Sequence, residues 1–600
     1  MPGTYSQLRN QFRRPPAAAT IETDTSTGSA ARLGKNPLQI GLSLLSKQCE
    51  SAGMTQRPYK TGASREQIQL LPARIEDYVD ADNPVRAIEA YVASLDLVEL
   101  GFLNAGGGGG PGQPGFDPAD LLKLYLYGYL NQVRSSRRLE RAAGRNVEVM
   151  WLLRGLRPCY RTIAEFRWTN AAALKAANRA FVLLAKELEL IGGTLVAIDG
   201  AFFHGNASKA SIKTRKRLDR DLAAIDADIE AYAQALEAND ARERSGEEAS
   251  GTGDAAGDGS EGSGGVADEI AALKAKRACI EADIERLERS GATQLSTTDP
   301  DARLLAKSGQ SIAGYNVQCV IDDKHKLIVE SEVVNDGNDA GQLHTMAAAA
   351  KSTLGASELT VLADGGYFNG DTLKACEDDA ITAYVPLPDR DSRMTAEGRF
   401  SLQAFTWDAE KDAYHCPNGM LLEPSGHKQQ SGKTYICYNS KQADCAACPL
   451  RARCLSAKGA RRTIYRWTDE VVLERHRVRM LDKDAAGIMR RRSALAEHPF
   501  GTIKCRAGYR HFLVRGFAKV RGEWSLMALC YNFTRVLNII GLDRLRAYLA
   551  AKRSGARLSP SLARLARPIA ALVALAAVIR RIFADFHTAA PRIAHEAAER

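Results

Sequence analysis

Three acidic residues, far apart in the chain, stand where carboxylates can hold metal ions. In LVAIDG, Asp199 follows the apolar residues, and in LTVLADGGY, Asp364 does the same. Glu497 is the first residue of EHPFGTIK. Magnesium is a hard cation that binds a few carboxylate oxygens and completes its shell with water and substrate phosphates. Two such ions activate an attacking oxygen and stabilise the leaving oxygen of an in-line displacement. The three acids therefore predict a phosphoryl-transfer site with two Mg2+ (or Mn2+) ions.

Each aspartate alone has a simpler interpretation, because an acid after a buried strand is most often a turn or cap residue. The surroundings of Glu497 favour the metal site. Between Arg490 and Arg521 the chain has nine Lys or Arg residues and a single acid, Glu497. A lone acid among so many cations is either the centre of a salt-bridge network or part of a site that meets a polyanion.

A second basic block runs from Arg134 to Arg167 and holds nine Arg and three acids, within a formal net charge of +10 for the whole chain. Clustered positive charge suits a phosphate backbone, whose binding is largely electrostatic. For one block taken alone, a solvated helix face is the more common interpretation. Arg137, Arg138 and Arg141 are the candidate DNA contacts of this block.

Several segments resemble the DDE transposases of bacterial insertion sequences, in which a Tyr, an Arg, the catalytic Glu and a Lys recur on one helical segment. More narrowly, the chain resembles the eleven-eighty-two group of the insertion-sequence-four-like superfamily. The matching segments are REQIQLLPARIEDYVDADNPVRAIEAYV, FDPADLLKLYLYGYLN, VAIDGAFF, GYNVQCVID, VLADGGYFNG, EHPFGTIK and SLMALCYNFTRVLNIIG. They run in one order from about Arg65 to Gly541, so the resemblance covers most of the chain. The family Tyr position holds Met489 or Arg490, and the Arg falls at Arg492, one residue farther from the Glu than usual.

The resemblance implies an α/β ribonuclease-H-like core, a mixed sheet flanked by helices, that cuts and joins double-stranded DNA. Asp199 would contact both metal ions, and Asp364 and Glu497 one each. Arg492 and Lys504 would hold the phosphates on either side of the scissile bond. Water attack at the element end would free a 3′ hydroxyl, which then attacks target DNA. Because two ends must be held together, a homodimer on paired ends is expected.

Two alternatives to a transposase remain. One is a catalytically inactive transposase-derived protein that only binds DNA, which the loss of an acid would reveal; all three acids are present. The other is a nuclease that hydrolyses DNA without joining it, and the sequence does not separate it from a transposase.

Five clustered cysteines predict a second metal site, a structural zinc. A Cys-x-x-Cys pair presents two thiolates from one tight turn, and zinc takes four such ligands tetrahedrally. Cys437 is a fifth thiol for four places, and a redox pair is the competing interpretation. The proposed ligands are Cys416, Cys445, Cys448 and Cys454.

Trp467 lies between these cysteines and Glu497. It is a candidate for stacking on a flipped base at the cleaved end. Packing in a core is the more common role of a tryptophan.

The elements that must position these residues follow from local patterns. Asp117 predicts a helix cap before ADLLKLYLYGYL, and a helix is expected from Gln342 to Leu354. Two heptad-like arms separated by a Gly/Ser/Asp/Glu-rich connector predict a helical hairpin. Mutual burial of the arms is favoured over a dimer seam. The order strand with Asp, hairpin, helix, strand with Asp is that of a ribonuclease-H-like fold, with a final helix carrying the Glu.

Six hundred residues with 45% apolar content imply roughly three or four folded domains. The longest apolar run near the C-terminus, residues 568–579, is too short to span a bilayer, so no membrane partner is expected. Without a secretory leader, and with scattered cysteines, a cytoplasmic, nucleoid-associated location in a bacterium is expected.

The predicted parts are a disordered leader at 1–53 with a natural start at Met54, an N-terminal helical DNA-binding domain at 54–190, the DDE catalytic domain at 191–205, 300–395 and 470–540, a coiled-coil hairpin insertion at 206–299, a cysteine-rich, zinc-ribbon-like and loop-rich insertion at 396–469, and a C-terminal helical tail at 541–600.

Overall fold

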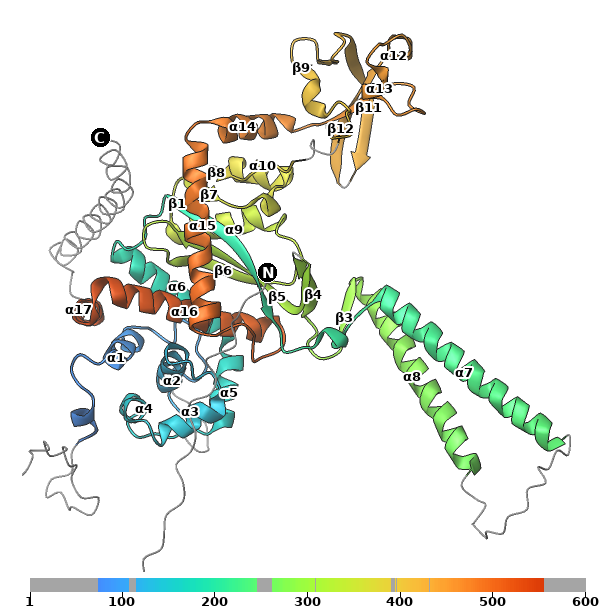
Figure 1. The fold of residues 1–600 in the computed structure, drawn as a ribbon. Helices are drawn as coiled ribbons and strands as arrows, with labels where there is room; N and C mark the ends of the chain where they lie inside the picture. The colour runs from blue at the N-terminus through green and yellow to red at the C-terminus, as the bar shows by residue number, and fades with distance from the viewer. Residues whose placement is uncertain are drawn as a thin grey trace, which may run out of the picture. The chain divides into compact units, whose positions relative to one another are not determined.

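The computed structural model describes residues 74–106, 115–244, 262–307, 309–389, 394, 396–430 and 432–554. Figure 1 shows the order of their helices and strands along the chain. Several predictions lie outside the described residues: those for the leader at 1–53 and a start at Met54, for most of the polar connector (245–261), and for the apolar run at 568–579.

A six-stranded mixed sheet carries the first two acids. Its order is β4-β5-β1-β7-β8, with β6 also paired to β5. β1 runs antiparallel to β5 and parallel to β7, and β7 runs parallel to β8. The strands are β1 (Leu195–His204), β4 (Arg303–Lys307), β5 (Gln310–Asp322), β6 (Ile328–Val334), β7 (Leu359–Leu362) and β8 (Ile381–Tyr384).

Helices cover both faces of this sheet, as the side chains of β1 show. Val196 and Ile198 belong to the main hydrophobic core, which includes residues of α9 (Gln342–Leu354). Ala197 points to the other face and packs in a separate cluster with residues of α15 (Ala485–Gly501). Successive side chains of a strand point to opposite faces, so α9 and α15 lie on opposite sides of β1. The expected bounds of the helix Gln342–Leu354 are confirmed.

The helices that precede the sheet share the same main core, which runs from Val79 to Leu549. The long helix α16 (Phe517–Ile540) packs along α6, α2 and α5. Gly522 allows the closest approach, because a Cβ there would lie 2.8 Å from the Cα of Ala171. Asp117 caps α2 by accepting a hydrogen bond from the Ala119 N–H, as predicted. These helices are η1 (Ile75–Tyr78), α1 (Val85–Ala93), α2 (Pro118–Leu130), α3 (Ser136–Ala143), α4 (Val147–Leu152), α5 (Tyr160–Thr169) and α6 (Ala171–Glu187), and α17 (Leu542–Arg553) follows α16.

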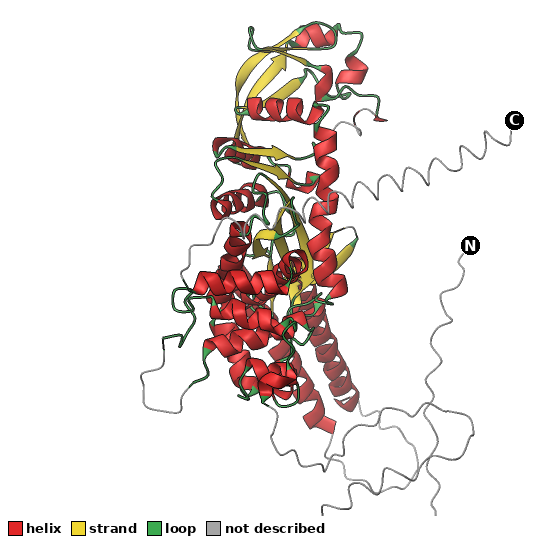
Figure 2. Cartoon of the chain, turned by 90° about the vertical axis from the view of Figure 1, so that its left-hand side faces the viewer, coloured by secondary structure: helices red, strands yellow, loops and turns green. Residues whose placement is uncertain are grey.

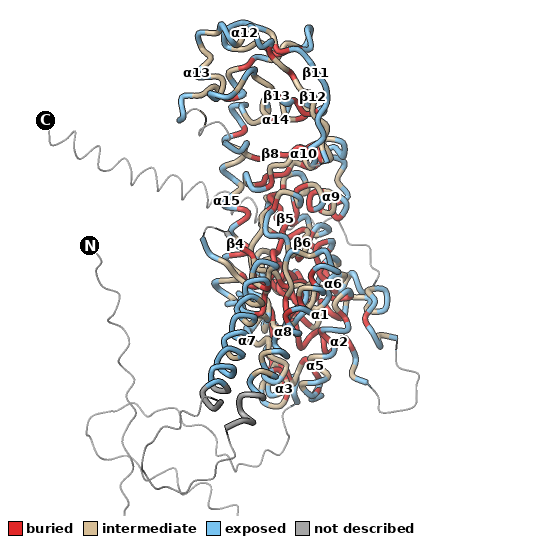
Figure 3. The backbone as a smooth tube through the Cα atoms, turned by 90° about the vertical axis from the view of Figure 1, so that its right-hand side faces the viewer, coloured by how far each residue is buried: buried red, intermediate tan, exposed pale blue. Residues whose placement is uncertain are grey.

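A helical hairpin interrupts the chain after β1. Its arms are α7 (Arg215–Arg244) and α8 (Gly262–Ser290), joined at the base by the strand pair β2 (Ile212–Thr214) and β3 (Gln294–Ser296), and η2 (Lys209–Ser211) precedes them. Leu218, Ile280 and Leu287 form a small core between the arms. Most other arm residues are exposed (Figure 3). Mutual packing therefore holds the base of the hairpin, in line with the interpretation that the sequence favoured over a dimer seam.

The cysteine-rich segment differs from the loop-rich insert that was predicted. It forms a five-stranded antiparallel sheet in the order β13-β12-β11-β10-β9, coloured as strands in Figure 2. Phe405, Tyr414, Leu422, Tyr438 and Ile464 make a core of its own. Scattered aromatic residues build this core, and their spacing is too irregular to show as strand periodicity. The elements are η4 (Leu402–Ala404), β9 (Thr406–Asp408), β10 (Ala413–His415), β11 (Leu421–Gln430), β12 (Lys433–Ser440), α12 (Gln442–Ala446), α13 (Arg451–Cys454) and β13 (Thr463–Trp467), followed by α14 (Glu470–Leu481).

Within the described ranges, no single helix is long and apolar enough to cross a membrane. Helices α16 and α17 have the required length and composition only as a pair, which is bent by 109°.

Candidate active site

Asp199 lies in β1, and Asp364 follows the end of the neighbouring parallel strand β7. The register of β1 and β7 pairs Ala197 with Leu362, and each aspartate comes two residues later. Parallel neighbours that continue in register stay side by side, so the two carboxylates emerge from the same edge of the sheet. Both residues are half-buried.

Each aspartate is oriented by the backbone of its own turn. Asp199 Oδ1 accepts a hydrogen bond from the Gly200 N–H at 2.9 Å. Asp364 caps the short 3-10 helix η3 (Gly365–Tyr367), and its Oδ1 accepts from the Gly366 N–H at 2.9 Å. A bond of this kind fixes a short side chain without neutralising its charge.

Helix α15 packs across β1 and carries Glu497 past the aspartates. Ala496 packs with Ala197 on one side of Asp199, and the Phe500 ring lies 6.3 Å from the Phe203 ring on the other side. Ala197, Asp199 and Phe203 share one face of the strand, because they alternate with residues of the other face. Glu497 therefore lies on α15 between the two residues that contact β1 on either side of Asp199. The Glu497 side chain is exposed.

The helix that carries Glu497 continues through Pro499. α15 extends to Gly501 and is followed by a π-helical turn, η5 (Thr502–Arg506). Arg492 and Glu497 thus share one helix, and Lys504 belongs to the π-helical turn. Such turns are frequent at functional sites. Glu497 Oε1 accepts a hydrogen bond from the Ser493 hydroxyl at 2.7 Å.

Lys504 reaches back to the strand that carries Asp199. Its Nζ donates to the Phe202 carbonyl at 2.7 Å and lies 4.4 Å from the centre of the Phe203 ring. Burial raises the pKa of the Cys319 thiol, Asp199 raises that pKa further, and Lys504 opposes the rise. One thiol therefore lies within electrostatic reach of both the aspartate and the lysine. Arg492 is half-exposed and makes no hydrogen bond or ion pair to another described residue.

The donor chemistry of the two aspartates fits Mg2+ or Mn2+, which take carboxylate oxygens. Among the residues that the structure describes, however, no three His, Cys, Asp or Glu side chains are gathered closely enough to enclose a metal ion. Asp199 lies in β1, Asp364 follows the end of the adjacent strand β7, and Glu497 lies on α15, which packs against β1. The role of Glu497 as a third ligand stays a prediction.

Asp339 is an acidic residue at this site that the sequence did not single out. It lies between β6 and α9 and is buried, with an exposed fraction of 8%. Burial raises the pKa of the Tyr367 hydroxyl, and the carboxylates of Asp339, Asp199 and Asp364 raise it further. Three aspartates therefore surround one tyrosine. In the sequence Asp339 belongs to NDGNDAG, a polar stretch that reads as an ordinary loop, so composition gave no signal for it.

The basic residues of α3 are joined to the segment that carries Lys504. Arg137, Arg138 and Arg141 are exposed. The turn before α3 contacts the segment after η5, because Arg134 Nη1 donates to the His511 carbonyl at 2.8 Å. His511 in turn forms a β-bridge with His204 at the end of β1. The two basic blocks of the sequence thus meet beside the strand of Asp199.

Two arginines of the basic block from Arg134 to Arg167 are structural. Arg134 and Arg167 lie 3.6 Å and 3.7 Å from the Oε1 of Glu523, whose side chain is fully buried in α16. Tyr129 donates a hydrogen bond to the same oxygen at 3.0 Å. A buried carboxylate needs such partners to offset its desolvation. This cluster ties α2 and α5 to α16.

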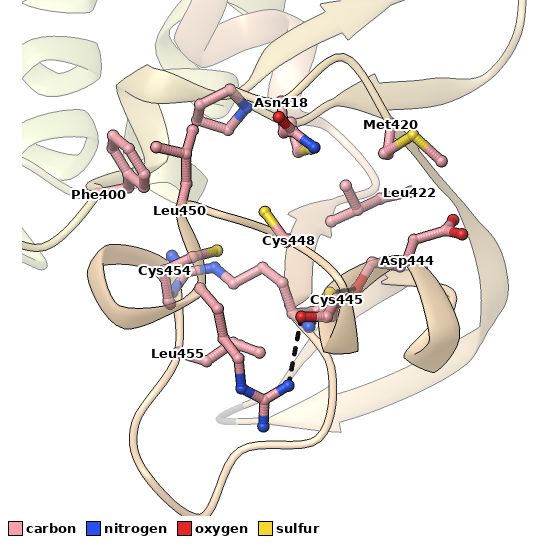
Figure 4. A pocket seen from close by; sticks show the side chains of 15 residues that line it. Phe400, Asn418, Met420, Leu422, Asp444, Cys445, Cys448, Leu450, Cys454 and Leu455 are labelled. Atoms are coloured by element: carbon pink, nitrogen blue, oxygen red, sulfur yellow. Dashed lines mark hydrogen bonds between the residues drawn. The ribbon is translucent and has the colours of Figure 1, made fainter.

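Four of the five clustered cysteines line one pocket, as Figure 4 shows for three of them by label. Burial raises the pKa of the Cys454 thiol; Arg462 opposes this rise, and Cys445, Cys416 and Cys448 add to it. Cys437 lies in β12 and is absent from the pocket lining. Among the described residues these thiols are not gathered closely enough to count as a metal-holding group, so bound zinc stays a prediction.

Trp467 is 6% exposed, and its indole packs where helix α10 (Gly370–Asp378) begins. A Cβ at Gly370 would lie 3.0 Å from the indole, and the Lys433 ammonium lies 4.6 Å from the ring centre. Trp467 and Lys433 border a recess of about 320 Å³. The packing shows the structural role of Trp467, and stacking on a base stays a prediction.

Comparisons with known proteins bear on both ends of the described chain. Residues 415–537 match the model of a family described as "Transposase DDE domain", and residues 73–168 match "Transposase domain (DUF772)". The first match contains Glu497 and the four pocket cysteines, whereas Asp199 and Asp364 lie outside both. The two matches together cover less than half of the chain.

No curated protein matches the chain. Among solved structures, a chain of the piggyBac transposase synaptic complex with hairpin DNA matches with 9% sequence identity and a TM-score of 0.26, over 82% of this chain and 80% of that one. A similarity this low carries no argument about fold or function. The two family matches support an insertion-sequence-type DDE transposase, an enzyme class that transposes DNA and generally uses divalent metal ions.

Proposed function

We propose that this protein binds the terminal inverted repeats of an insertion sequence and catalyses metal-dependent DNA strand cleavage and strand transfer. The register of the parallel strands β1 and β7, whose last pair precedes each aspartate by two residues, together with α15 packed against β1, is the observation that supports the proposal. The strand order, three antiparallel strands continued by two parallel ones, supports a ribonuclease-H-like core. The ordered set of sequence motifs supports membership of the eleven-eighty-two group.

In this proposal Asp199, Asp364 and Glu497 would hold two Mg2+ ions, which supply charge stabilisation at the attacking and leaving oxygens when bound. The backbone bonds at Gly200 and Gly366 keep the two aspartates in place before DNA arrives. Arg492 would bind a DNA phosphate through its fork of donors, and Lys504 would offer a point charge. Both lie on the same continuous segment as Glu497, so this segment would position the metal-binding acid together with the residues that bind DNA phosphates.

Arg137, Arg138 and Arg141 would bind the duplex beyond the cleaved end. Their contact is with phosphates and therefore depends on salt. Replacing Arg138 by Ala is expected to weaken DNA binding and to reduce the slope of log K against log salt by about one. Arg179→Ala is a control, because Arg179 is also exposed but lies on α6.

The proposal includes a homodimer on paired ends, because one target site must receive two element ends. Light scattering with and without repeat DNA tests it. A complex containing one protein chain for each pair of ends would contradict this part. We also propose a structural zinc ion in the pocket of Cys416, Cys445, Cys448 and Cys454.

The deciding experiment combines purified protein, Mg2+ and linear DNA that carries the flanking inverted repeats. Wild type is expected to cut at the repeat ends and to join the 3′ ends to target DNA. Asp199→Asn is expected to lower cleavage by about a hundredfold or more, because a metal contributes several kcal/mol to the transition state. Its DNA binding should persist, since arginines and lysines provide it.

Asp336→Asn serves as the matched control, because Asp336 is an exposed aspartate of the loop before α9. Equal cutting by wild type and Asp199→Asn would refute the site. Cutting without any joined product would instead indicate a nuclease.

A further inference from the structure

A buried polar network lies beneath the end of β1. The Oδ1 of Asp339 accepts hydrogen bonds from the side-chain amides of Asn316 at 2.8 Å and Gln318 at 2.7 Å. Asn316 and Gln318 are fully buried in β5. A buried carboxylate held by two amide donors is rigid, because losing either donor would leave charge without compensation.

This network supports the residue that follows Asp199. A Cβ at Gly200 would lie 2.5 Å from Gln318 Nε2, 2.8 Å from Asp339 Oδ1 and 3.0 Å from Asn316 Oδ1. Real Cβ atoms do not approach other atoms this closely, so only glycine fits above the network. The Asn316 Oδ1, which faces Gly200, is buried and has no hydrogen-bond partner among the described residues. The strand therefore lies directly on the network at Gly200.

The same network reaches the turn that carries Asp364. A Cβ at Gly366 would lie 2.9 Å from Asp364 Oδ1 and 4.0 Å from Asp339 Oδ2. The Tyr367 hydroxyl donates to Gln318 Oε1. Asp339 Oδ1 thus lies where a side chain at Gly200 would stand, and Asp339 Oδ2 faces the side of Gly366 on which a Cβ would lie.

We propose that Asp339 is a positioning residue for the two strand-end aspartates. The network occupies the space beneath Gly200 and lies near the turn of Gly366, so it would set the separation of Asp199 and Asp364, and the charge of Asp339 would favour a cation beside them. This inference rests on the proposed metal-dependent function. Partners behind metal ligands commonly change metal affinity or activity about 10-fold to 100-fold when they are replaced.

The test measures Mn2+ binding to the purified full-length protein by electron paramagnetic resonance, without DNA. Asp339→Asn keeps the shape and one oxygen that can accept from Asn316 and Gln318, so the fold should persist while the charge is lost. We expect Mn2+ binding about 10-fold weaker than in wild type, with circular dichroism and the melting temperature preserved. Asp336→Asn should bind Mn2+ as wild type does.

Gly200→Ala gives an independent variant, because its methyl group would displace the network while all carboxylates remain. We expect a similar loss of Mn2+ affinity. Gly337→Ala is its control, since nothing lies within 4 Å of a Cβ at Gly337. If Asp339→Asn does not fold, Gly200→Ala decides the question alone.

The outcomes separate the two proposals. Mn2+ affinity that falls in Asp199→Asn but stays at the wild-type value in folded Asp339→Asn would overturn the positioning role alone. If only Gly200→Ala folds, wild-type affinity in that variant overturns the role in the same way. A wild-type protein that binds no Mn2+, or binds it equally after Asp199→Asn, would overturn the proposed metal site and this inference with it.

Discussion

Asp199 and Asp364 occupy matching positions on two adjacent parallel strands, each two residues beyond the paired residues Ala197 and Leu362. The chain between them contains the helical hairpin, β5, β6 and α9, so their proximity is a product of sheet pairing. Each carboxylate is also held by a backbone N–H of the following turn. If these two acids bind metal ions as proposed, a third protein ligand would have to come from outside the sheet.

Glu497 is the predicted third ligand, and its replacement tests that role. Glu497→Gln keeps the size and the hydrogen bond from Ser493 but removes the charge. We expect DNA cleavage to fall by about a hundredfold or more, while DNA binding in a gel-shift assay is retained. Asp484→Asn is the matched control, because Asp484 is an exposed acid at the start of the same helix. Cleavage by Glu497→Gln at the rate of this control would remove Glu497 from the site.

The four-cysteine pocket predicts different zinc contents after replacement of Cys448 and of Cys437. Cys448→Ser should release zinc and lower the melting temperature, because the ion offsets the small core of this segment. Cys437→Ser should keep the zinc, since Cys437 lies outside the pocket lining. Emission spectroscopy of the purified variants measures the metal content. Full zinc content in Cys448→Ser would exclude the four-thiolate site.

Glu523 predicts a large loss of stability if its buried charge pairs are broken. Glu523→Ala leaves Arg134 and Arg167 without their carboxylate partner and removes the acceptor for the Leu513 N–H. Removing one partner of a buried pair costs about 3–5 kcal/mol. Urea unfolding followed by circular dichroism measures the change. Glu358→Gln, at an exposed position, should leave the unfolding midpoint where it is in wild type. A midpoint in Glu523→Ala equal to that control would contradict the role of the cluster.

His476 predicts a dependence of stability on pH. Its Nε2 lies 2.8 Å from the Val385 carbonyl, and burial lowers the pKa of its ring below the usual 6.5, with Arg479 adding to the effect. As pH falls below about 6.5, the unfolded chain takes up a proton before the folded one does, so stability falls. Burial likewise lowers the pKa of His325, His498 and His511.

We therefore expect the free energy of unfolding to decrease from about pH 7.5 to about pH 5.5 in wild type, and to decrease less in His476→Gln. Glutamine retains a donor for the Val385 carbonyl but does not titrate. His427→Gln, at an exposed position of β11, is the control and should behave as wild type. The same decrease in His476→Gln and wild type would show that His476 does not contribute.

Local patterns identified the elements whose signals are contained in a few neighbouring residues. The helix Gln342–Leu354 was predicted with its observed bounds, and Asp117 was recognised as a cap, because both depend on contacts within one or two turns. The cysteine segment was less accessible. Its five-stranded sheet is held by an aromatic core whose residues come from several strands.

The sequence by itself determined which residue types are present for chemistry: three separated acids, two basic blocks and a set of clustered thiols. Only the tertiary structure decided which of them meet. It paired the strands that precede Asp199 and Asp364, separated Cys437 from the other four cysteines, and made Arg134 and Arg167 partners of Glu523. It also brought Asp339 from an unremarkable loop to the backbone beside both aspartates. Such tertiary contacts depend on pairing between segments that are far apart in the chain, and no local sequence pattern encodes them.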